Sequence, residues 1–266
     1  MSELDDILVR ITDATRERLA AEPAGPGLER RAWEAAGVRR RGGVRSLLGS
    51  LSAPGVRVIA ECKRRSPSAG VLRAPFEPVE LATAYQAGGA AAISVVTEPQ
   101  FFSGQPGWLP LVRAAVALPV VQKDFLVSSR QLFEAVLLGA DAVLLIARIL
   151  PGGLLGEMVA VAKELGLEVL LEIHDQHDLA RSAGLPARVI GVNARDLRTF
   201  TVDLGAAAAL AVAVGPGRVA VLESGITGPA DVADCVRRGV SRFLVGEHLL
   251  RAADPGEAVR ELVACG

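Results

Sequence analysis

Carboxylate and ammonium side chains stand at the ends of several short apolar runs in this sequence. Glu61 and Lys63 end the first run, Lys123 the third and Glu172 the fifth, and Asn193 lies near the end of the sixth. Ammonium and carboxyl groups can donate and accept protons, and an amide can hydrogen-bond an intermediate. An i, i+2 spacing places Glu61 and Lys63 on the same face of an extended strand. These residue types predict acid–base chemistry if the fold brings the run ends together.

The elements that would position these side chains repeat along the chain from Val56 onward. Eight short runs are nearly continuously hydrophobic, as parallel strands buried on both faces are. Segments with helical spacing lie between the runs, and glycines stand where helix C-caps favour them. The runs cover 56–62, 91–98, 119–125, 141–148, 167–173, 188–195, 218–224 and 241–247.

Eight strand–helix units fit a closed barrel or an open doubly wound sheet. The number eight, the chain length and the absence of GxGxxG after the first run favour a (β/α)8 TIM barrel, forming one domain over 1–266. The charge-rich residues 1–50 predict about two helices, broken near Pro23 to Gly27, that form an N-terminal extension packed on the barrel. All strands of a barrel end on one face, so the polar run ends, Glu98 and Arg148 among them, would converge there around a polar ligand.

Glycine-containing segments follow the last two runs. Gly225 lies in ESGI and Gly246 in VGEHLL, where a short helix is expected to begin. Glycine lets a phosphate approach the backbone, and a helix N-terminus presents free N–H groups to it. Barrels often bind phosphate after their last two strands. We therefore predict a phosphate site at Gly225, Gly246 and Glu247, against the alternative that these glycines serve only tight turns.

Two loops at the same end of the barrel carry further candidates. The segment 63–80 is long and contains Pro, Ser, Gly and basic residues, so it could act as a lid or clamp. Its bases Arg64, Arg65 and Arg73 fit solvated surface charges equally well. The loop after the second run carries Phe101 and Phe102, which could supply an apolar wall for a ring, or one of them could serve packing alone.

Composition narrows the functional classes. The 266 residues carry a net charge of −1, which gives no electrostatic case for binding nucleic acid. No apolar stretch of about 18 residues is present and the N-terminus is acidic, so we expect no membrane span, no signal peptide and a cytoplasmic location. Three distant cysteines indicate neither a disulfide framework nor a zinc site, and the pair His174 and His177 is weak evidence for a metal. We therefore expect no metal.

Taken in order, the segments that hold these candidates resemble the indole-3-glycerol phosphate synthase family, a barrel enzyme of tryptophan biosynthesis. The similarity runs from about Val56 to Val263, and the helical N-terminus also suits the family. The segments are IAECKRRSPSAG, AAAISVVTEPQFFSG, VVQKDFLV, GADAVLLIARIL, LLEIHD, IGVNARDLRTFTVDL, VLESGI and FLVGEHLLRA. The departures from the family's pattern remove no catalytic group; they are Cys62, Ala69, Ala194, Glu247 and His248.

The resemblance implies a small anionic substrate, 1-(2-carboxyphenylamino)-1-deoxyribulose 5-phosphate. The implied reaction closes the indole ring with loss of CO₂ and then of water, and it needs no cofactor. Lys123 would be the general acid of ring closure, paired with Glu172. Glu61 and Lys63 would supply the acid and the base of dehydration, in either order.

The resemblance also implies how the substrate is held. Ser66 and Arg195 would bind the carboxylate, for which a guanidinium fork is apt. Phe102 and Glu223 are further substrate-binding candidates. Asn193 and Ser224 are further catalytic candidates. The phosphate is expected at the backbone of Ser224, Gly225, Gly246 and Glu247. We expect a monomer or weak homodimer that has no nucleic-acid or membrane partner.

Three alternatives stay open. Another phosphate-binding barrel isomerase would use carboxylate or Cys/Asp pairs, so the two inward lysines, Lys63 and Lys123, argue against it. A barrel that serves only as a scaffold would be expected to have lost one of the four catalytic charged groups, and all are present. A paralogue that supplies indole units to a secondary pathway would share the same chemistry.

Overall fold

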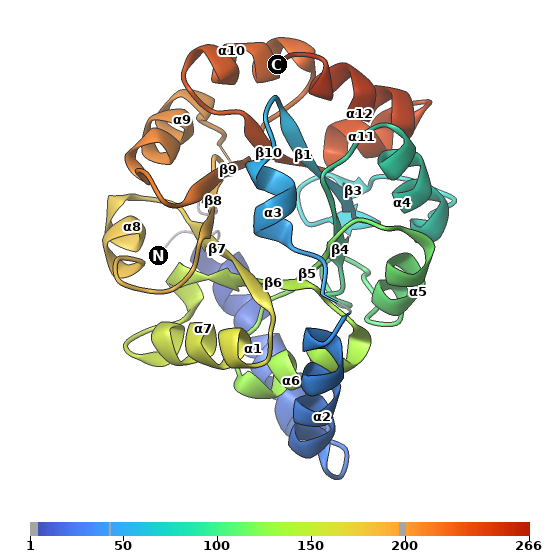
Figure 1. Ribbon diagram of the computed structural model, residues 1–266, viewed down its shortest axis with the longest axis vertical. Helices are drawn as coiled ribbons and strands as arrows, with labels where there is room; N and C mark the ends of the chain where they lie inside the picture. The colour runs from blue at the N-terminus through green and yellow to red at the C-terminus, as the bar shows by residue number, and fades with distance from the viewer. Residues whose placement is uncertain (1–4, 43, 197–200) are drawn as a thin grey trace.

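Eight parallel strands close into a barrel in the computed structural model, which describes residues 5–42, 44–196 and 201–266. The ring order β1-β10-β9-β8-β7-β6-β5-β4 follows the sequence around the barrel (Figure 1). The predicted (β/α)8 fold is therefore confirmed. The strands are β1 (Arg57–Cys62), β4 (Ala92–Val96), β5 (Val120–Lys123), β6 (Ala142–Ile146), β7 (Glu168–Ile173), β8 (Val189–Asn193), β9 (Val219–Glu223) and β10 (Arg242–Val245).

Helices surround the barrel and cover its outer face (Figure 1). Several begin at a side chain that accepts a backbone N–H, such as Ser128 before α6 and Asp203 before α9. Gly139 ends α6 in the left-handed conformation, with φ of 88°. The helices are α4 (Pro78–Ala87), α5 (Trp108–Ala115), α6 (Ser129–Leu138), η1 (Ala147–Ile149), α7 (Leu154–Glu164), α8 (Gln176–Arg181), α9 (Leu204–Ala213), α10 (Pro229–Arg237), α11 (Glu247–Arg251) and α12 (Pro255–Val263).

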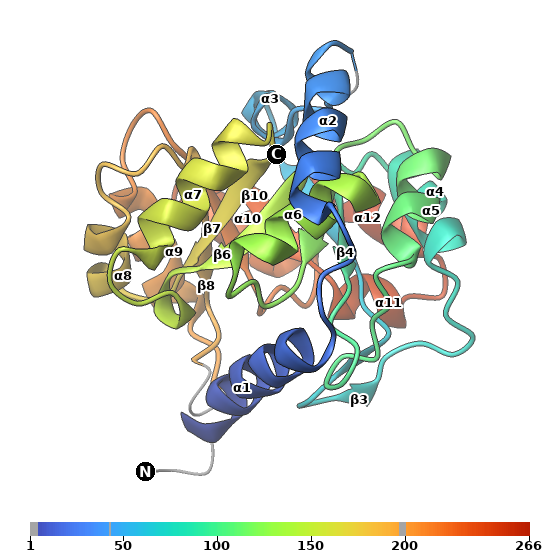
Figure 2. The same cartoon turned by 90° about the horizontal axis from the view of Figure 1, so that it is seen from below.

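The N-terminal extension contains three helices rather than the expected two: α1 (Asp5–Ala21), α2 (Leu28–Arg40) and α3 (Leu47–Ser52). The third was missed because six residues with a central glycine carry too little periodicity to predict a helix. Helices α1 and α3 lie at opposite ends of the barrel (Figure 2). No helix within the described ranges is both long and apolar enough to cross a membrane.

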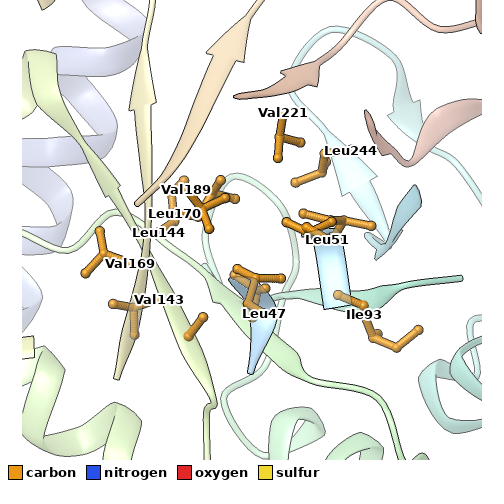
Figure 3. Close-up of a cluster of buried hydrophobic side chains, with 14 of the residues drawn as sticks. Leu47, Leu51, Ile93, Val143, Leu144, Val169, Leu170, Val189, Val221 and Leu244 are labelled. Atoms are coloured by element: carbon orange, nitrogen blue, oxygen red, sulfur yellow. The ribbon is translucent and has the colours of Figure 1, made fainter. Parts of the chain in front are cut away.

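Helix α3 closes the end of the barrel where the strands begin. Its buried side chains Leu47 and Leu51 lie among those of the strands (Figure 3). Glu168, the first residue of β7, accepts the Leu48 N–H at 2.7 Å, and Arg242, the first residue of β10, donates to the carbonyl of Leu51 at 2.8 Å. Apolar packing and hydrogen bonds to the strand starts therefore hold this plug in place.

A buried carboxylate ties the extension to the barrel wall. Asp141, fully buried at the start of β6, lies 3.6 Å from Arg39 of α2 and 3.1 Å from Arg113 of α5. It also accepts the backbone N–H groups of Arg45 and Val120, at 3.1 and 3.0 Å. Removing one partner of a buried ion pair leaves the others desolvated without compensation.

Asp141→Ala is expected to lower the free energy of unfolding by about 3–5 kcal/mol, because Arg39 and Arg113 would stay buried without this carboxylate. Chemical denaturation of the full chain measures the change. Asp234→Ala is the matched control, since Asp234 pairs with Arg237 and Arg238 at the surface and its loss is expected to leave the midpoint near that of the unmodified chain. Equal losses for the two variants would contradict the role given to Asp141.

Candidate active site

A cavity of about 400 Å³ opens where the strands end, and helix α1 lies over it. All thirteen side chains or glycines predicted as site residues line this cavity. Their convergence follows from the parallel barrel, which brings every strand's carboxyl end to one face. They are Glu61, Lys63, Ser66, Phe102, Lys123, Glu172, Asn193, Arg195, Glu223, Ser224, Gly225, Gly246 and Glu247.

Lys123, the last residue of β5, lies between two carboxylates. Its Nζ is 2.9 Å from Oε2 of Glu223 and 3.2 Å from Oε2 of Glu172. Burial alone would lower the pKa of Lys123, but Glu223, Glu172 and Glu61 raise it well above its usual value. Lys123 is therefore held as an ammonium and can donate a proton.

The two carboxylates beside Lys123 differ in their affinity for protons. Burial and the nearby carboxylates Glu172 and Glu61 raise the pKa of Glu223 to about 7, against the opposing effect of Lys123. Glu172 is also buried, but Lys123, His174 and a hydrogen bond from Asn193 at 3.2 Å together lower its pKa. Environments that separate two carboxyl pKa values suit groups that carry protons at different stages of a reaction.

A glycine makes room for Glu223. A Cβ at Gly191 of β8 would overlap with Oε1 of Glu223 and lie 3.0 Å from its Cδ. The structure therefore explains this glycine in the middle of a strand by the close approach of a carboxylate. The sequence analysis missed Gly191, and the only signal for it was the glycine itself within the run 188–195.

Glu61 and Lys63 form the second charged pair in the cavity at the carboxyl ends of the strands, called the mouth of the barrel below. Lys63 Nζ donates to Oε1 of Glu61 at 2.5 Å, as their i, i+2 spacing predicted. A Cβ at Gly246 would lie 2.6 Å from that same oxygen, so Gly246 also leaves space for a carboxylate. The hydroxyl of Tyr85 donates to the Glu61 carbonyl at 3.4 Å from the outer side of the strand. Glu61 is therefore fixed through both its backbone and its side chain.

The long first loop is pinned to the barrel. It forms a small hairpin of β2 (Arg65–Ser66) and β3 (Gly70–Val71), and the Ser66 hydroxyl accepts the Ala69 N–H at 3.1 Å. The Arg73 guanidinium donates to the carbonyls of Leu250 and Ala252, at 3.0 and 3.1 Å. Arg73 is thus a structural group rather than a solvated surface charge, and Ser66 faces the cavity from the anchored loop.

The two phenylalanines of the second loop have different places. Phe102 lines the cavity and contacts Phe125, with ring centroids 5.9 Å apart. Phe101 instead lies 5.9 Å from the Arg10 guanidinium carbon of α1. The buried carboxylate of Glu98 accepts the backbone N–H groups that form the turn, those of Gln100, Phe101 and Phe102. Glu98 therefore shapes the loop that carries Phe102 instead of facing a ligand.

Helix α1 supplies an apolar roof that sequence analysis did not predict. Ile7, Leu8 and Ile11 line the cavity, and Ile11 is almost fully buried. Arg130 of α6 holds the far end of the helix by donating to the carbonyls of Leu19, at 2.8 Å, and Glu22. The extension is thus part of the site as well as of the fold.

The glycine-containing ends of β9 and β10 form the other side of the mouth. Ser224 and Gly225 both adopt left-handed backbone, with φ of 67° and 84°, and a Cβ at Gly225 would overlap with Val202. Gly246 precedes the short helix α11, and the Glu247 side chain pairs with Arg251 at 2.9 Å. Both glycines are thus needed for close packing, Gly225 against Val202 and Gly246 against Glu61, and the phosphate site at this edge stays a prediction.

Two other polar positions differ from expectation. Arg148 follows β6 in the turn η1 and pairs with Asp175 at 2.8 Å, so it does not line the mouth, because the chain turns before its side chain can face inward. Arg195 does line the mouth, and its N–H donates to Oδ1 of Asn193 at 3.1 Å. Residues 197–200, in the middle of the segment IGVNARDLRTFTVDL, lie outside the described residues.

The histidine pair does not form one metal-binding group. His174 is buried beside Glu172, whereas His177 is exposed and lies near Asp175 and Asp178. Asp175 already caps α8 and pairs with Arg148, so its carboxylate has structural partners.

A family model described as indole-3-glycerol phosphate synthase matches residues 8–262. The chain belongs to the indole-3-glycerol phosphate synthase family. The indole-3-glycerol phosphate synthases of Aromatoleum aromaticum and Azoarcus sp. are 45% and 44% identical over 260 and 262 residues, covering 97% of this chain and 99% of each relative. The resemblance inferred from the motifs is therefore confirmed.

More distant solved structures share the barrel. A thiamine phosphate pyrophosphorylase from Pyrococcus furiosus is 17% identical with a TM-score of 0.59, and a 3-hexulose-6-phosphate synthase is 16% identical with a TM-score of 0.62. Each similarity covers 79% of this chain and 95% or 99% of the other. At these identities the similarity shows the fold alone.

Gly191→Ala is expected to reduce kcat about 10²-fold while the barrel stays folded, because the added methyl displaces Glu223 from Lys123 and misplaced reacting groups lose rate steeply. Steady-state kinetics with circular dichroism measures both properties. Gly107→Ala is the control, since a Cβ at Gly107 meets no atom within 4 Å and its φ is −63°. Unchanged kcat in Gly191→Ala would show that the Glu223–Lys123 contact is dispensable.

Proposed function

We propose that this barrel closes the indole ring of 1-(2-carboxyphenylamino)-1-deoxyribulose 5-phosphate, with loss of CO₂ and then of water, to give indole-3-glycerol phosphate. This is the carboxy-lyase reaction of the family, in tryptophan biosynthesis. The observation that carries the proposal is the Lys123 ammonium, held between Glu172 and Glu223 in the mouth of a barrel of this family.

Lys123 is the proposed general acid of ring closure. The aromatic carbon that carries the carboxylate attacks the C2 carbonyl of the ribulose chain, and the carbonyl oxygen gains negative charge. An ammonium beside that oxygen stabilises the charge and gives it a proton. The C–CO₂ bond then breaks, and its electron pair restores the aromatic ring. Glu172 holds the ammonium through its contact with Lys123, and Asn193 holds Glu172 by donating to Oε1 of that carboxylate.

Glu61 and Lys63 are the proposed pair for dehydration. One group protonates the hydroxyl formed at C2, which leaves as water, and the other removes a proton from the neighbouring carbon, so that the double bond of the indole forms. Their 2.5 Å contact allows a proton to pass between them.

The ends of the substrate would be bound by separate parts of the mouth. Ser66 and Arg195 are proposed for the carboxylate, and Phe102 with the apolar roof of α1 for the aromatic ring. The backbone around Ser224, Gly225, Gly246 and Glu247 is proposed for the phosphate. Rearomatisation drives the loss of CO₂, so this sequence of steps calls for no metal or organic cofactor. The expected cytoplasmic location and the monomer or weak homodimer stay predictions.

Lys123→Ala is expected to lower kcat by at least about 10²-fold in a fluorescence assay of indole-3-glycerol phosphate formation. Lys163→Ala is the matched control, because Lys163 on α7 is exposed and is the one lysine of the chain outside the mouth. Turnover that survives in Lys123→Ala would reject Lys123 as the acid. Absence of turnover in the unmodified protein, with tight binding of the substrate, would favour the scaffold alternative.

A further inference from the structure

His174 has a buried side chain beside Glu172, behind the residues that line the cavity, and the proposed reaction does not use it. It follows directly after β7, and its side chain is 4% exposed. Its ring lies between two carboxylates: Nε2 is 3.3 Å from Oε1 of Glu172, and Nδ1 is 3.7 Å from Oδ2 of Asp178. Neither nitrogen makes a well-aligned hydrogen bond within the described part of the chain, although each lies near a carboxylate oxygen.

The carboxylate behind the ring is itself held in place. Asp178, in the first turn of α8, accepts the backbone N–H of His174 at 3.1 Å. Arg148 lies 3.7 Å from the same oxygen, Oδ2, and pairs with the exposed Asp175. A row of polar side chains thus runs from Arg148 near the surface through Asp178 and His174 to Glu172.

We propose that His174 is a positioning residue of the reaction, which holds Oε1 of Glu172 in place and, when protonated, puts a positive charge beside it, with Asp178 fixing the ring. The proposal rests on the function proposed above, in which Glu172 acts as an ionised partner of Lys123. His174 acts through Glu172 and not on the substrate.

The charges around Glu172 explain why a second cation is needed there. Lys123 approaches Oε2 of Glu172 but is shared with Glu223, and the other lysine of the cavity, Lys63, is paired with Glu61. Asn193, the partner of Oε1 on β8, is neutral. Burial would raise the pKa of Glu172, and Lys123 together with His174 lowers it. Without His174, Glu172 would therefore bind a proton at higher pH and release Lys123 to Glu223.

The test is the pH profile of kcat for the full-length protein with the His174→Asn substitution. An opposite charge within a few ångströms shifts a carboxyl pKa by about one unit or more, so the acidic limb of the profile is expected to move up by about one pH unit. KM is expected to stay within about twofold of its original value, because His174 does not touch the substrate. His177→Asn changes an exposed histidine that lies near Asp175 and Asp178 rather than beside Glu172, so it is the matched control and should move the acidic limb far less.

Two further variants separate charge from shape. His174→Gln keeps an N–H donor near Glu172 without the charge, so it is expected to keep the plateau kcat of the unmodified protein while the acidic limb is displaced as in His174→Asn. Asp178→Asn loosens the ring and is expected to displace the limb in the same direction by a smaller amount. If His174→Asn fails to fold in a thermal melt, Asp178→Asn decides between the outcomes.

A uniform fall in kcat with an unmoved acidic limb would mean that His174 serves packing alone, and it would overturn the proposal. Kinetics of His174→Asn identical to those of the unmodified protein would overturn it as well. Failure of the underlying function is distinguishable, because it would appear as absence of turnover in the unmodified protein.

Discussion

The contact of the Lys123 ammonium with Glu172 and Glu223 organises the mouth of this barrel. Two carboxylates cannot both stay ionised at close range in a largely dry site unless a cation lies between them. Here the cation is strongly held and the two carboxyl pKa values move apart, downward for Glu172 and to about 7 for Glu223. The same interaction that makes the buried charges tolerable keeps Lys123 protonated, as the proposed ring closure requires.

The rest of the structure preserves this arrangement. Gly191 and Gly246 leave room for carboxylates within the wall, and Glu98 shapes the loop that brings Phe102 to the cavity. The N-terminal segment closes both ends of the barrel: α3 plugs the end where strands begin, and α1 roofs the end where they finish (Figure 2). Asp141 connects this segment to the barrel wall through Arg39 of α2. The segment that covers the cavity is therefore also held by a buried ion pair.

Much of this could be predicted from the sequence, for physical reasons. Near-continuous apolar runs indicate buried parallel strands, and all strands of a parallel barrel end on the same face. The convergence of Glu61, Lys123 and Glu172 could therefore be predicted. Strand alternation predicts where a side chain points only within the strand, and Arg148 lies beyond the end of β6. Arg148 therefore turned to Asp175.

The features that sequence reasoning missed depend on partners distant in the chain. The helical pattern of α1 shows that one face is buried but not that the face covers the active site. The proposed role of His174 depends on its neighbours, Asp178 on the next helix and Glu172 inside the barrel, and the sequence does not show that they are close. The need for glycine at position 191 becomes clear only from the structure, in which the carboxylate of Glu223 on the neighbouring strand lies against it.

A double-mutant cycle of Lys123→Ala and Glu223→Gln, read as kcat/KM, tests the central claim most directly. If Glu223 acts through the Lys123 ammonium, the double variant should be about as slow as Lys123→Ala alone, within about threefold, because the second change removes a partner of a group already absent. Losses that multiply in the double variant would mean that the two residues act independently. That result would contradict an active site organised by their contact.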